Sequence, residues 1–365
     1  MCVTGSGAGP RAMRTLRAGI IALLAVVALS PRPAARSLPL ALFERYLGSL
    51  REETGIPGLS VAVVQSRRLV WEAGFGRQDA EKNLPARADT PYLIGDLTQS
   101  FSAIVLGQCV ERTGLDINTP MRRWASLPES SATVGHVLSH TSAGTPGETF
   151  AYDPGRFGLL ASVSQDCSRR PFQRAVAEDI FDRLGMNDSV PGRDLAGMGS
   201  LDDRYFDNDR LRAYEGVLAR LAAPYRVDRA GRATRGDYPS PAVSASTGLV
   251  STVRDLARFD IALDDDALIG GDLRQIAWTN VTASSGAPLP MGLGWFVQSY
   301  NGERLVWQLG TVRDAGSSLL LKVPGRELTL ILLANGDGLA PADTLSTGDI
   351  TSSVFVRLFL KLFLL

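Results

Sequence analysis

A carboxyl and a primary amide lie one helical turn apart in the segment Asp96-Leu97-Thr98-Gln99. Phe101, Ile104 and Val105 follow at helical spacing, so the segment is predicted to open a buried helix. Asp with Gln three residues later is the capping-box pattern, in which the carboxylate accepts backbone N–H bonds and the amide reaches back. The same carboxyl could act as a general acid or base, or as a nucleophile, if burial raised its pKa. Helix capping has the opposite effect, because it stabilises the anion and lowers the pKa.

Eight short stretches spread over the chain carry a resemblance to a known protein family. In order they read IPGLSVAV (56–63), TPYLIG (90–95), HVLSHTS (136–142), PGETFAY (146–152), FDRLGM (181–186), STGLVST with DLA (246–252 and 255–257), GLGW (292–295) and LLAN (332–335). Together they resemble the serine β-lactamase and penicillin-binding-protein superfamily, in particular its branch of class C β-lactamases, D-alanyl-D-alanine carboxypeptidases and esterases. Each stretch alone is weakly specific, but the eight in this order predict the β-lactamase-like fold.

The resemblance places three catalytic motifs, and each is altered in this chain. In the family, the lysine of Ser-x-x-Lys removes the proton of the serine hydroxyl as the oxygen attacks a carbonyl. Asp96 and Gln99 stand at these two positions here. The Tyr-x-Asn motif reads YDP (152–154), so Tyr152 is kept while Pro154 replaces the amide that would orient a substrate. The Lys-Thr-Gly or His-x-Gly motif reads QLG (308–310), in which only the glycine is kept.

The resemblance also implies that the oxyanion hole is formed by the backbone N–H groups of Asp96 and Thr311. The Asp96 carboxylate is then expected to lie beside the hole or to fill it, and to oppose any developing negative charge. Tyr152 has no lysine partner, so we expect its pKa to stay near the ordinary value of about 10 and its hydroxyl to donate a hydrogen bond. The predicted pocket consists of the positions that match the family motifs: Asp96, Gln99, Tyr152, Pro154, Gln308, Gly310 and Thr311.

No replacement nucleophile with its base can be found elsewhere in the chain. The chain has three lysines, Lys82, Lys322 and Lys361, and the residue three positions before each is Asp or Leu. A Gly-x-Ser-x-Gly elbow is also absent, and both histidines, His136 and His140, lie in one short segment, which leaves few ways to form a Ser-His-Asp triad. Two histidines four apart can bind zinc, but a third ligand is missing, so we expect packing or hydrogen-bonding roles and no metal or cofactor.

Three functional interpretations remain. The favoured one is a catalytically inactive serine-hydrolase homologue whose cleft between two lobes binds a small-molecule ligand or a protein partner. The second is an enzyme with altered chemistry that uses Asp96 and Tyr152. The third, an ordinary esterase, β-lactamase or peptidase, is disfavoured because loss of the nucleophile alone typically costs about a millionfold in turnover. The resemblance also implies a trimmed wall of the cleft, because family members commonly have a longer loop where this chain has only residues 143–145, and this argues against a peptidoglycan stem or a β-lactam as the ligand.

The N-terminal segment has the pattern of a secretory leader. Arg11, Arg14 and Arg17 precede an apolar run over 18–29, and prolines and small residues follow. Residues 1–37 are therefore predicted to be a leader, with translation starting at Met1 or Met13, and the protein to be secreted or periplasmic. The apolar run is short for a bilayer span, so no stable membrane span is expected after cleavage, and an uncleaved anchor is the alternative. Formal net charge is zero and there is no basic stripe, which argues against nucleic-acid binding.

The periodicity predicts an α+β domain over residues 38–365. Its antiparallel sheet is built from both chain ends, with strands near 59–65, 69–75, 294–299, 304–308, 317–322 and 328–333. The sheet lobe is expected to comprise 38–95 and 239–365, and a mainly helical lobe to comprise 96–238. An N-terminal helix should bury Phe43, Tyr46, Leu47 and Leu50. The resemblance implies that the apolar C-terminal helix, 354–365, packs beside it, with contact to a membrane as the alternative.

Cys109 and Cys167 both fall in predicted helices. They can form a disulfide only if their backbones lie close together, which the sequence does not show. Two buried thiols are the favoured interpretation.

Overall fold

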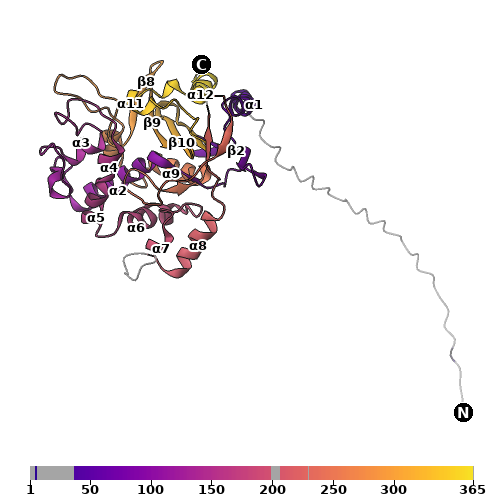
Figure 1. The fold of residues 1–365 in the computed structure, drawn as a ribbon, viewed down its shortest axis with the longest axis horizontal. Helices are drawn as coiled ribbons and strands as arrows, with labels where there is room; N and C mark the ends of the chain where they lie inside the picture. Colours follow the sequence, from indigo (N-terminus) through magenta and orange to yellow (C-terminus); the bar gives the residue numbers. More distant parts are fainter. Residues whose placement is uncertain (1–4, 6–36, 199–205, 229, 365) are drawn as a thin grey trace, which may run out of the picture. The chain divides into compact units, whose positions relative to one another are not determined.

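The main sheet has seven antiparallel strands in the computed structural model, which describes residues 37–198, 206–228 and 230–364 together with Gly5. Their spatial order is β3-β2-β1-β11-β10-β9-β8, so the first and last strands of the sequence meet at the middle of the sheet (Figure 1). The strands are β1 (Gly58–Gln65), β2 (Arg68–Asp79), β3 (Leu84–Pro85), β8 (Phe296–Tyr300), β9 (Glu303–Val312), β10 (Gly316–Val323) and β11 (Leu328–Ala334). The predicted fold class is confirmed.

Both faces of this sheet are covered, which explains the continuous apolar runs of its central strands. On β11, Leu330 and Leu332 belong to one core cluster, whereas Ile331 and Leu333 belong to the other. The first cluster is closed by α1 (Leu38–Glu53) and α12 (Val354–Leu364), and the second by helices from the middle of the chain. A side chain of these central strands is therefore removed from water whichever face it points to.

The two terminal helices pack against each other on one face of the sheet, as expected (Figure 1). The ring of Phe43 lies 5.5 Å from that of Phe359 and 5.8 Å from that of Phe363, measured between centroids. The predicted buried face of α1 is wrong at Tyr46, which is 48% exposed. Leu40 is buried instead, because it lies one turn before Phe43 on the face that meets the sheet.

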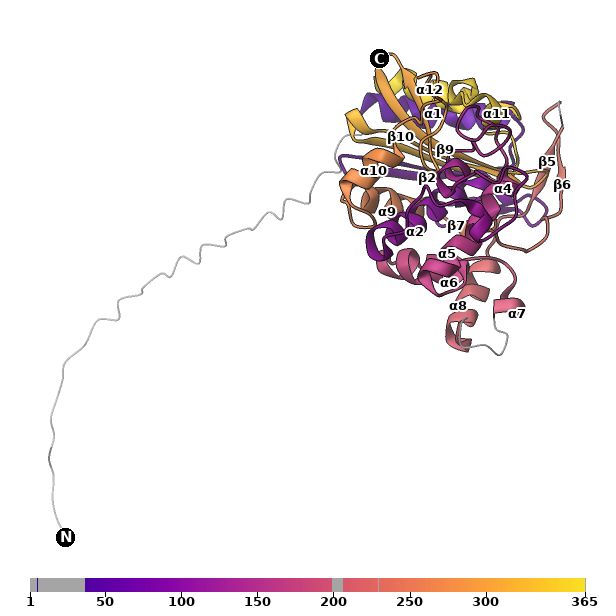
Figure 2. The ribbon, with the colours of Figure 1, turned by 90° about the vertical axis from the view of Figure 1, so that its left-hand side faces the viewer.

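Helices from the middle of the chain cover the other face of the sheet, and α9 contacts β1, β2 and β11 (Figure 2). The helices of this part of the chain are α2 (Thr98–Thr113), α3 (Val134–Leu138), α4 (Pro154–Gly158), α5 (Leu160–Ser168), α6 (Phe172–Val176), α7 (Leu195–Met198), α8 (Asn208–Leu218), α9 (Val253–Asp264) and α10 (Gly271–Ala277). Of these, α5 and α6 pack on α2, and α7 packs on α8 farther from the sheet (Figure 2). A short helix, α11 (Thr344–Thr347), precedes α12. Two small ladders join β4 (Tyr92–Leu93) to β7 (Val250–Ser251) and β5 (Tyr225–Val227) to β6 (Ala233–Arg235).

No helix in the described ranges combines the length and the apolar character that crossing a bilayer requires. The predicted leader, residues 1–37, lies outside the described residues apart from Gly5 and Ser37.

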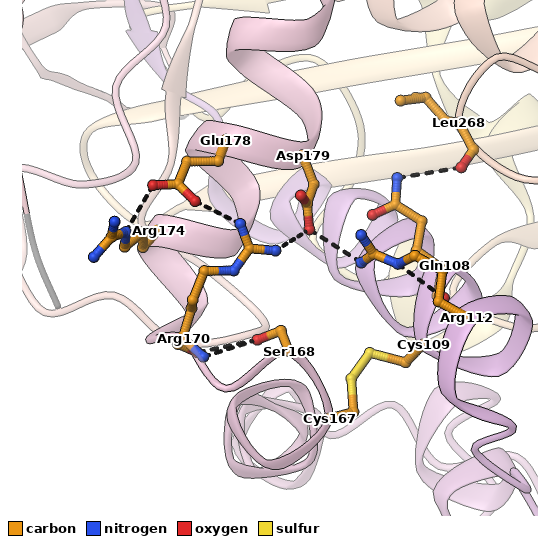
Figure 3. A network of polar contacts seen from close by, with 10 residues as sticks. All are labelled: Gln108, Cys109, Arg112, Cys167, Ser168, Arg170, Arg174, Glu178, Asp179 and Leu268. Atoms are coloured by element: carbon orange, nitrogen blue, oxygen red, sulfur yellow. Dashed lines mark hydrogen bonds and ion pairs between the residues drawn. A yellow bond between two sulfur atoms is a disulfide. The ribbon is translucent and has the colours of Figure 1, made fainter.

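Cys109 and Cys167 form a disulfide, with their Cα atoms 6.0 Å apart. The expectation of two buried thiols is therefore wrong, because α2 and α5 pack side by side and bring the two backbones within bonding range. Figure 3 shows the bond beside a group of ion pairs in which Arg112 and Arg170 both contact Asp179. The disulfide and these ion pairs together tie the C-terminal end of α2 to its neighbours.

Candidate functional site

The predicted capping box does not form. Gly95–Leu97 is a 3₁₀ turn, α2 begins at Thr98, and neither end of this junction has a side-chain cap. Asp96 therefore does not lie at the cap of the α-helix, and its side chain turns towards strand β9, where its Oδ2 accepts a hydrogen bond from the backbone N–H of Thr311 at 3.4 Å. Gln99 lies inside the first turn of α2 and makes its hydrogen bonds to other elements, described below.

Two glycines allow the turn before α2 to pack directly on strand β9. A Cβ atom at Gly310 would lie 1.9 Å from the carbonyl oxygen of Ile94, which no side chain can tolerate. Gly95 has a φ of 53°, and a Cβ there would lie 3.0 Å from the backbone of Thr311. The backbone at the site is therefore fixed by packing, independently of any catalytic group.

The Asp96 carboxylate is buried and has no ion-pair partner among the described residues; the whole residue is 9% exposed. Burial raises its pKa to about 7, and hydrogen bonds from the backbone N–H groups of Thr311 and of Asp96 itself oppose this shift. Helix capping would lower the pKa of Asp96, and this expectation is wrong. The start of α2 has no side-chain cap, and burial is the largest cause of the pKa shift. Of the two N–H groups that the resemblance assigns to the oxyanion hole, that of Thr311 donates to this carboxylate.

Gln99 is fully buried, and both ends of its amide are hydrogen-bonded. Its Nε2 donates to the hydroxyl oxygen of Tyr152 at 2.9 Å. Its Oε1 lies 2.9 Å from Nε2 of His140 and accepts from Nε2 of Gln308 at 3.3 Å. The side chain that stands at the lysine position therefore holds three other elements together and carries no charge.

His140 belongs to the site, and its hydrogen bonds agree with the packing or hydrogen-bonding role expected for it. It lies beyond the end of α3 with a φ of 53°, so it does not share a helix with His136. Its Nδ1 accepts from the backbone N–H of Asp153 at 2.9 Å, which leaves Nε2 to carry the proton and donate to Gln99. Burial lowers its pKa to about 3, against the opposing charge of Asp153, so the ring is neutral at pH 7. The HVLSHTS stretch was the signal that could have placed it here.

Tyr152 stacks between two rings at the edge of this network. Its ring centroid lies 4.4 Å from that of His140 and 6.0 Å from that of Phe296. Burial and the charge of Asp96 raise its pKa well above the ordinary value, and the hydrogen bond from Gln99 opposes this rise. The expectation of a pKa near 10 is wrong for this reason, and the phenol stays protonated as a donor.

Two further predicted positions contribute little polar chemistry. Pro154 opens α4 behind the cap residue Asp153 and has no hydrogen-bonding side-chain group. Gln308 is fully buried, and its Oε1 accepts from the backbone N–H of Leu309 at 3.2 Å. Hydrogen bonds thus connect Asp96 with Thr311, and Gln99 with Tyr152, His140 and Gln308, whereas Pro154 stands outside both groups.

The chemistry open to this arrangement is narrow. His140, Gln99 and Gln308 are neutral, and Tyr152 holds its proton, so Asp96 is the one group of the network that titrates near neutral pH. Within the described ranges, no cluster of three His, Cys, Asp or Glu residues has a metal-binding arrangement. Proton transfer by a single carboxyl is the remaining possibility.

Several known proteins are similar to this chain over part of their length. The mouse (Mus musculus) serine beta-lactamase-like protein LACTB, mitochondrial, is 28% identical over 120 residues, which cover 30% of this chain and 22% of that protein. Protein flp of Staphylococcus aureus (strain MW2) is 20% identical over 320 residues, or 77% of this chain and 60% of that protein. Penicillin-binding protein 4* of Bacillus subtilis (strain 168) is 20% identical over 313 residues, or 76% of this chain and 67% of that protein. The chain thus spans about a fifth of the mouse protein and three fifths of Protein flp.

Solved structures share the fold at low sequence identity. The octameric penicillin-binding protein homologue from Pyrococcus abyssi has a TM-score of 0.69 and 21% identity, covering 84% of this chain and 75% of that one. The D-amino acid amidase from Ochrobactrum anthropi SV3 has a TM-score of 0.64 and 18% identity, covering 88% and 98%. Residues 43–351 match the family model described as Beta-lactamase. Because this match takes in most of the sequence, the chain belongs to the beta-lactamase family.

Proposed function

We propose that the protein is a catalytically inactive member of the beta-lactamase family whose cleft, between the helical lobe (96–238) and the sheet lobe (38–95 and 239–365), binds a ligand or a protein partner. The observation that carries this proposal is the hydrogen bond from the Thr311 N–H to the Asp96 carboxylate. A carboxyl held at this donor takes a position that a developing oxyanion would need, and when ionised it repels the charge of that oxyanion.

The absence of a base supports the same conclusion. An acyl-transfer site needs a nucleophile within hydrogen-bond reach of a group that removes its proton. Gln99 has no proton-accepting role of this kind, and both ends of its amide are already engaged by neighbours. Ser100 follows it directly but points into the core, where its hydroxyl is fully buried.

Altered chemistry is the second candidate, and the pKa of Asp96 favours it. A carboxyl that titrates at about 7 is suited to accept or donate a proton at neutral pH. The protonated Tyr152 hydroxyl could then hydrogen-bond to the reacting group. Such an enzyme would transfer protons and would form no acyl-serine.

Export is proposed for the mature protein. The leader-like pattern of residues 1–37 supports it, and so does the Cys109–Cys167 disulfide, because disulfides persist in oxidising compartments such as the periplasm. The alternative is attachment to the membrane by an uncleaved leader.

Turnover assays separate the two candidates. The purified protein should hydrolyse neither nitrocefin nor p-nitrophenyl butyrate above the buffer rate, and Asp96→Asn should behave in the same way. If the unmodified protein shows turnover that Asp96→Asn abolishes without lowering the melting temperature, the altered-chemistry candidate replaces the inactive one. Turnover that survives in Asp96→Asn would point to another nucleophile and contradict both.

A further inference from the structure

A cavity of about 300 Å³ lies beside the site and is used by none of the chemistry described above. Its walls come from Leu93 of β4, from Arg193 before α7, and from the segments 239–244 and 247–248. Leu93 is two residues from Gly95, and β4 is paired with β7, which follows the cavity-lining Gly248. The cavity is therefore close in sequence to the turn that holds Asp96, through β4, but it is lined by other residues.

Arg193 is the only charged side chain among the described residues that line this cavity. Its Nη2 donates to the carbonyl oxygens of Pro239 at 2.5 Å and Ser240 at 3.3 Å, and its guanidinium lies 4.7 Å from the ring centroid of Tyr238. Neither Nε nor Nη1 has a hydrogen-bond partner in the described part of the chain, and no described carboxylate pairs with this arginine. Partial burial lowers the pKa of Arg193, and the nearby Tyr238 opposes this shift. This direction is expected for a guanidinium that has no carboxylate partner.

The rest of the lining combines hydroxyl groups with apolar surface. Ser240 and Thr247 contribute hydroxyls, and Leu93, Pro239 and Val243 contribute apolar side chains. A guanidinium with free N–H donors binds a carboxylate through charge-assisted hydrogen bonds, and the apolar wall suits a hydrocarbon body. One positive charge matches one negative charge, whereas a phosphate dianion would bring more charge than the single arginine neutralises.

We propose that this cavity is a binding site for a monocarboxylate with an apolar body, held through its carboxylate by Arg193. The proposal concerns residues outside the altered motifs and does not depend on whether Asp96 has a catalytic role.

Calorimetric titration with sodium hexanoate tests the site on the intact protein. Hexanoate should bind saturably, whereas hexanamide, which has the same shape without the charge, should bind at least about tenfold more weakly. Hexyl phosphate should bind more weakly than hexanoate at a pH where it is a dianion. Arg193→Gln should weaken hexanoate binding by about tenfold or more, and Arg193→Lys, which keeps the charge, should lose less. The matched control is Arg68→Gln, an exposed arginine outside this cavity, which should bind hexanoate like the unmodified protein.

Several outcomes would overturn the proposal. These are the absence of hexanoate binding, equal binding of hexanoate and hexanamide, or equal hexanoate binding by the unmodified protein and a folded Arg193→Gln variant. Tighter binding of hexyl phosphate would overturn the assignment to monocarboxylates. If Arg193→Gln fails to fold, the comparison of hexanoate with hexanamide on the unmodified protein still decides whether charge is required. Failure of hexanoate binding would leave the turnover results of the Asp96 site unchanged, so the two proposals fail separately.

Discussion

The backbone N–H of Thr311 on β9 lies 3.4 Å from Oδ2 of Asp96 in the turn before α2. Thr311 follows Gly310, where the strand approaches this turn too closely for any side chain. The Asp96 carboxyl is therefore held against a backbone donor of β9 whose position relative to the turn is fixed by packing. A reacting carbonyl would have to displace a group that belongs to the chain and that, when ionised, carries the same charge as the oxyanion it forms.

The Asp96 carboxyl should make stability depend on pH. Its pKa is about 7 in the folded protein and about 3.9 in an unfolded chain, so the stability it contributes is full below pH 4 and is lost as pH rises through 7. Asp96→Asn should remove this loss and raise the free energy of unfolding at pH 8 by about 2–4 kcal/mol relative to the unmodified protein. Urea unfolding at pH 5 and pH 8 checks this. Parallel pH profiles for both proteins would contradict the raised pKa.

Gln99→Leu should destabilise the protein by about 2–4 kcal/mol, because it leaves the Nε2–H of His140 and the amide of Gln308 without their acceptor in a buried site. The free energy of unfolding measures this loss. Gln165→Leu, at an exposed position on α5, is the control and should change stability by no more than about 0.5 kcal/mol. Equal effects of the two substitutions would mean that the buried network is not stabilising.

Gly310→Ala should destabilise the protein by about 3 kcal/mol or more, since its Cβ would lie 1.9 Å from the carbonyl oxygen of Ile94. Gly216→Ala in α8 is the matched control, because a Cβ there meets nothing within 4 Å and alanine favours the helix. Thermal unfolding of both variants tests the prediction. A Gly310→Ala variant as stable as the unmodified protein would show that β9 and the turn can separate without cost.

Reduction of the Cys109–Cys167 disulfide should lower the free energy of unfolding by about 2–4 kcal/mol, since the bond closes a loop across a sequence separation of 58. Urea unfolding with and without a reductant measures the difference, and the double substitution of both cysteines by serine should reproduce it. If mass spectrometry of the exported protein found two free thiols, the paired state would be wrong.

Much of the fold could be predicted from the sequence, because strand patterns and turn residues are local signals. The strands predicted near 294–299 and 304–308 are examples, since they correspond to β8 and β9, and β9 extends beyond its predicted range by Glu303 and by residues 309–312. The capping box at Asp96 was wrong for a non-local reason, since the Thr311 N–H competes for the carboxylate from a strand more than 200 residues away. The pairing of Cys109 with Cys167 likewise depends on how two helices pack.

The site shows the same limit. Motif positions could place Asp96 near Thr311, but the pKa values depend on burial, which spacing does not reveal. His140 lies in the site because the chain turns sharply after α3. The turn depends on the positive φ of His140, which was not predicted from the sequence. Arg193 carries no motif and is recognised only from the cavity that it lines.

Restoring a serine and a lysine at positions 96 and 99 tests whether the backbone of the site could still support catalysis. The double substitution Asp96→Ser with Gln99→Lys would supply a nucleophile and a base at helical spacing. We expect weak hydrolysis of small activated esters and none of β-lactams, because Pro154 and Gln308 still lack the orienting groups, and a misplaced substrate can cost about a hundredfold. If the double variant folds but shows neither turnover nor covalent labelling, groups other than the side chains of residues 96 and 99 must also prevent a substrate from binding productively.

Covalent labelling tests the central claim most directly. The purified mature protein is incubated with a fluorescent penicillin and, separately, with a fluorophosphonate, and its intact mass is measured, with penicillin-binding protein 4* of Bacillus subtilis as the positive control for the penicillin. The proposed filling of the oxyanion hole by Asp96 and the missing Ser-Lys pair predict an unchanged mass with both probes. A stoichiometric adduct that peptide mapping places on any serine of the chain would contradict the account.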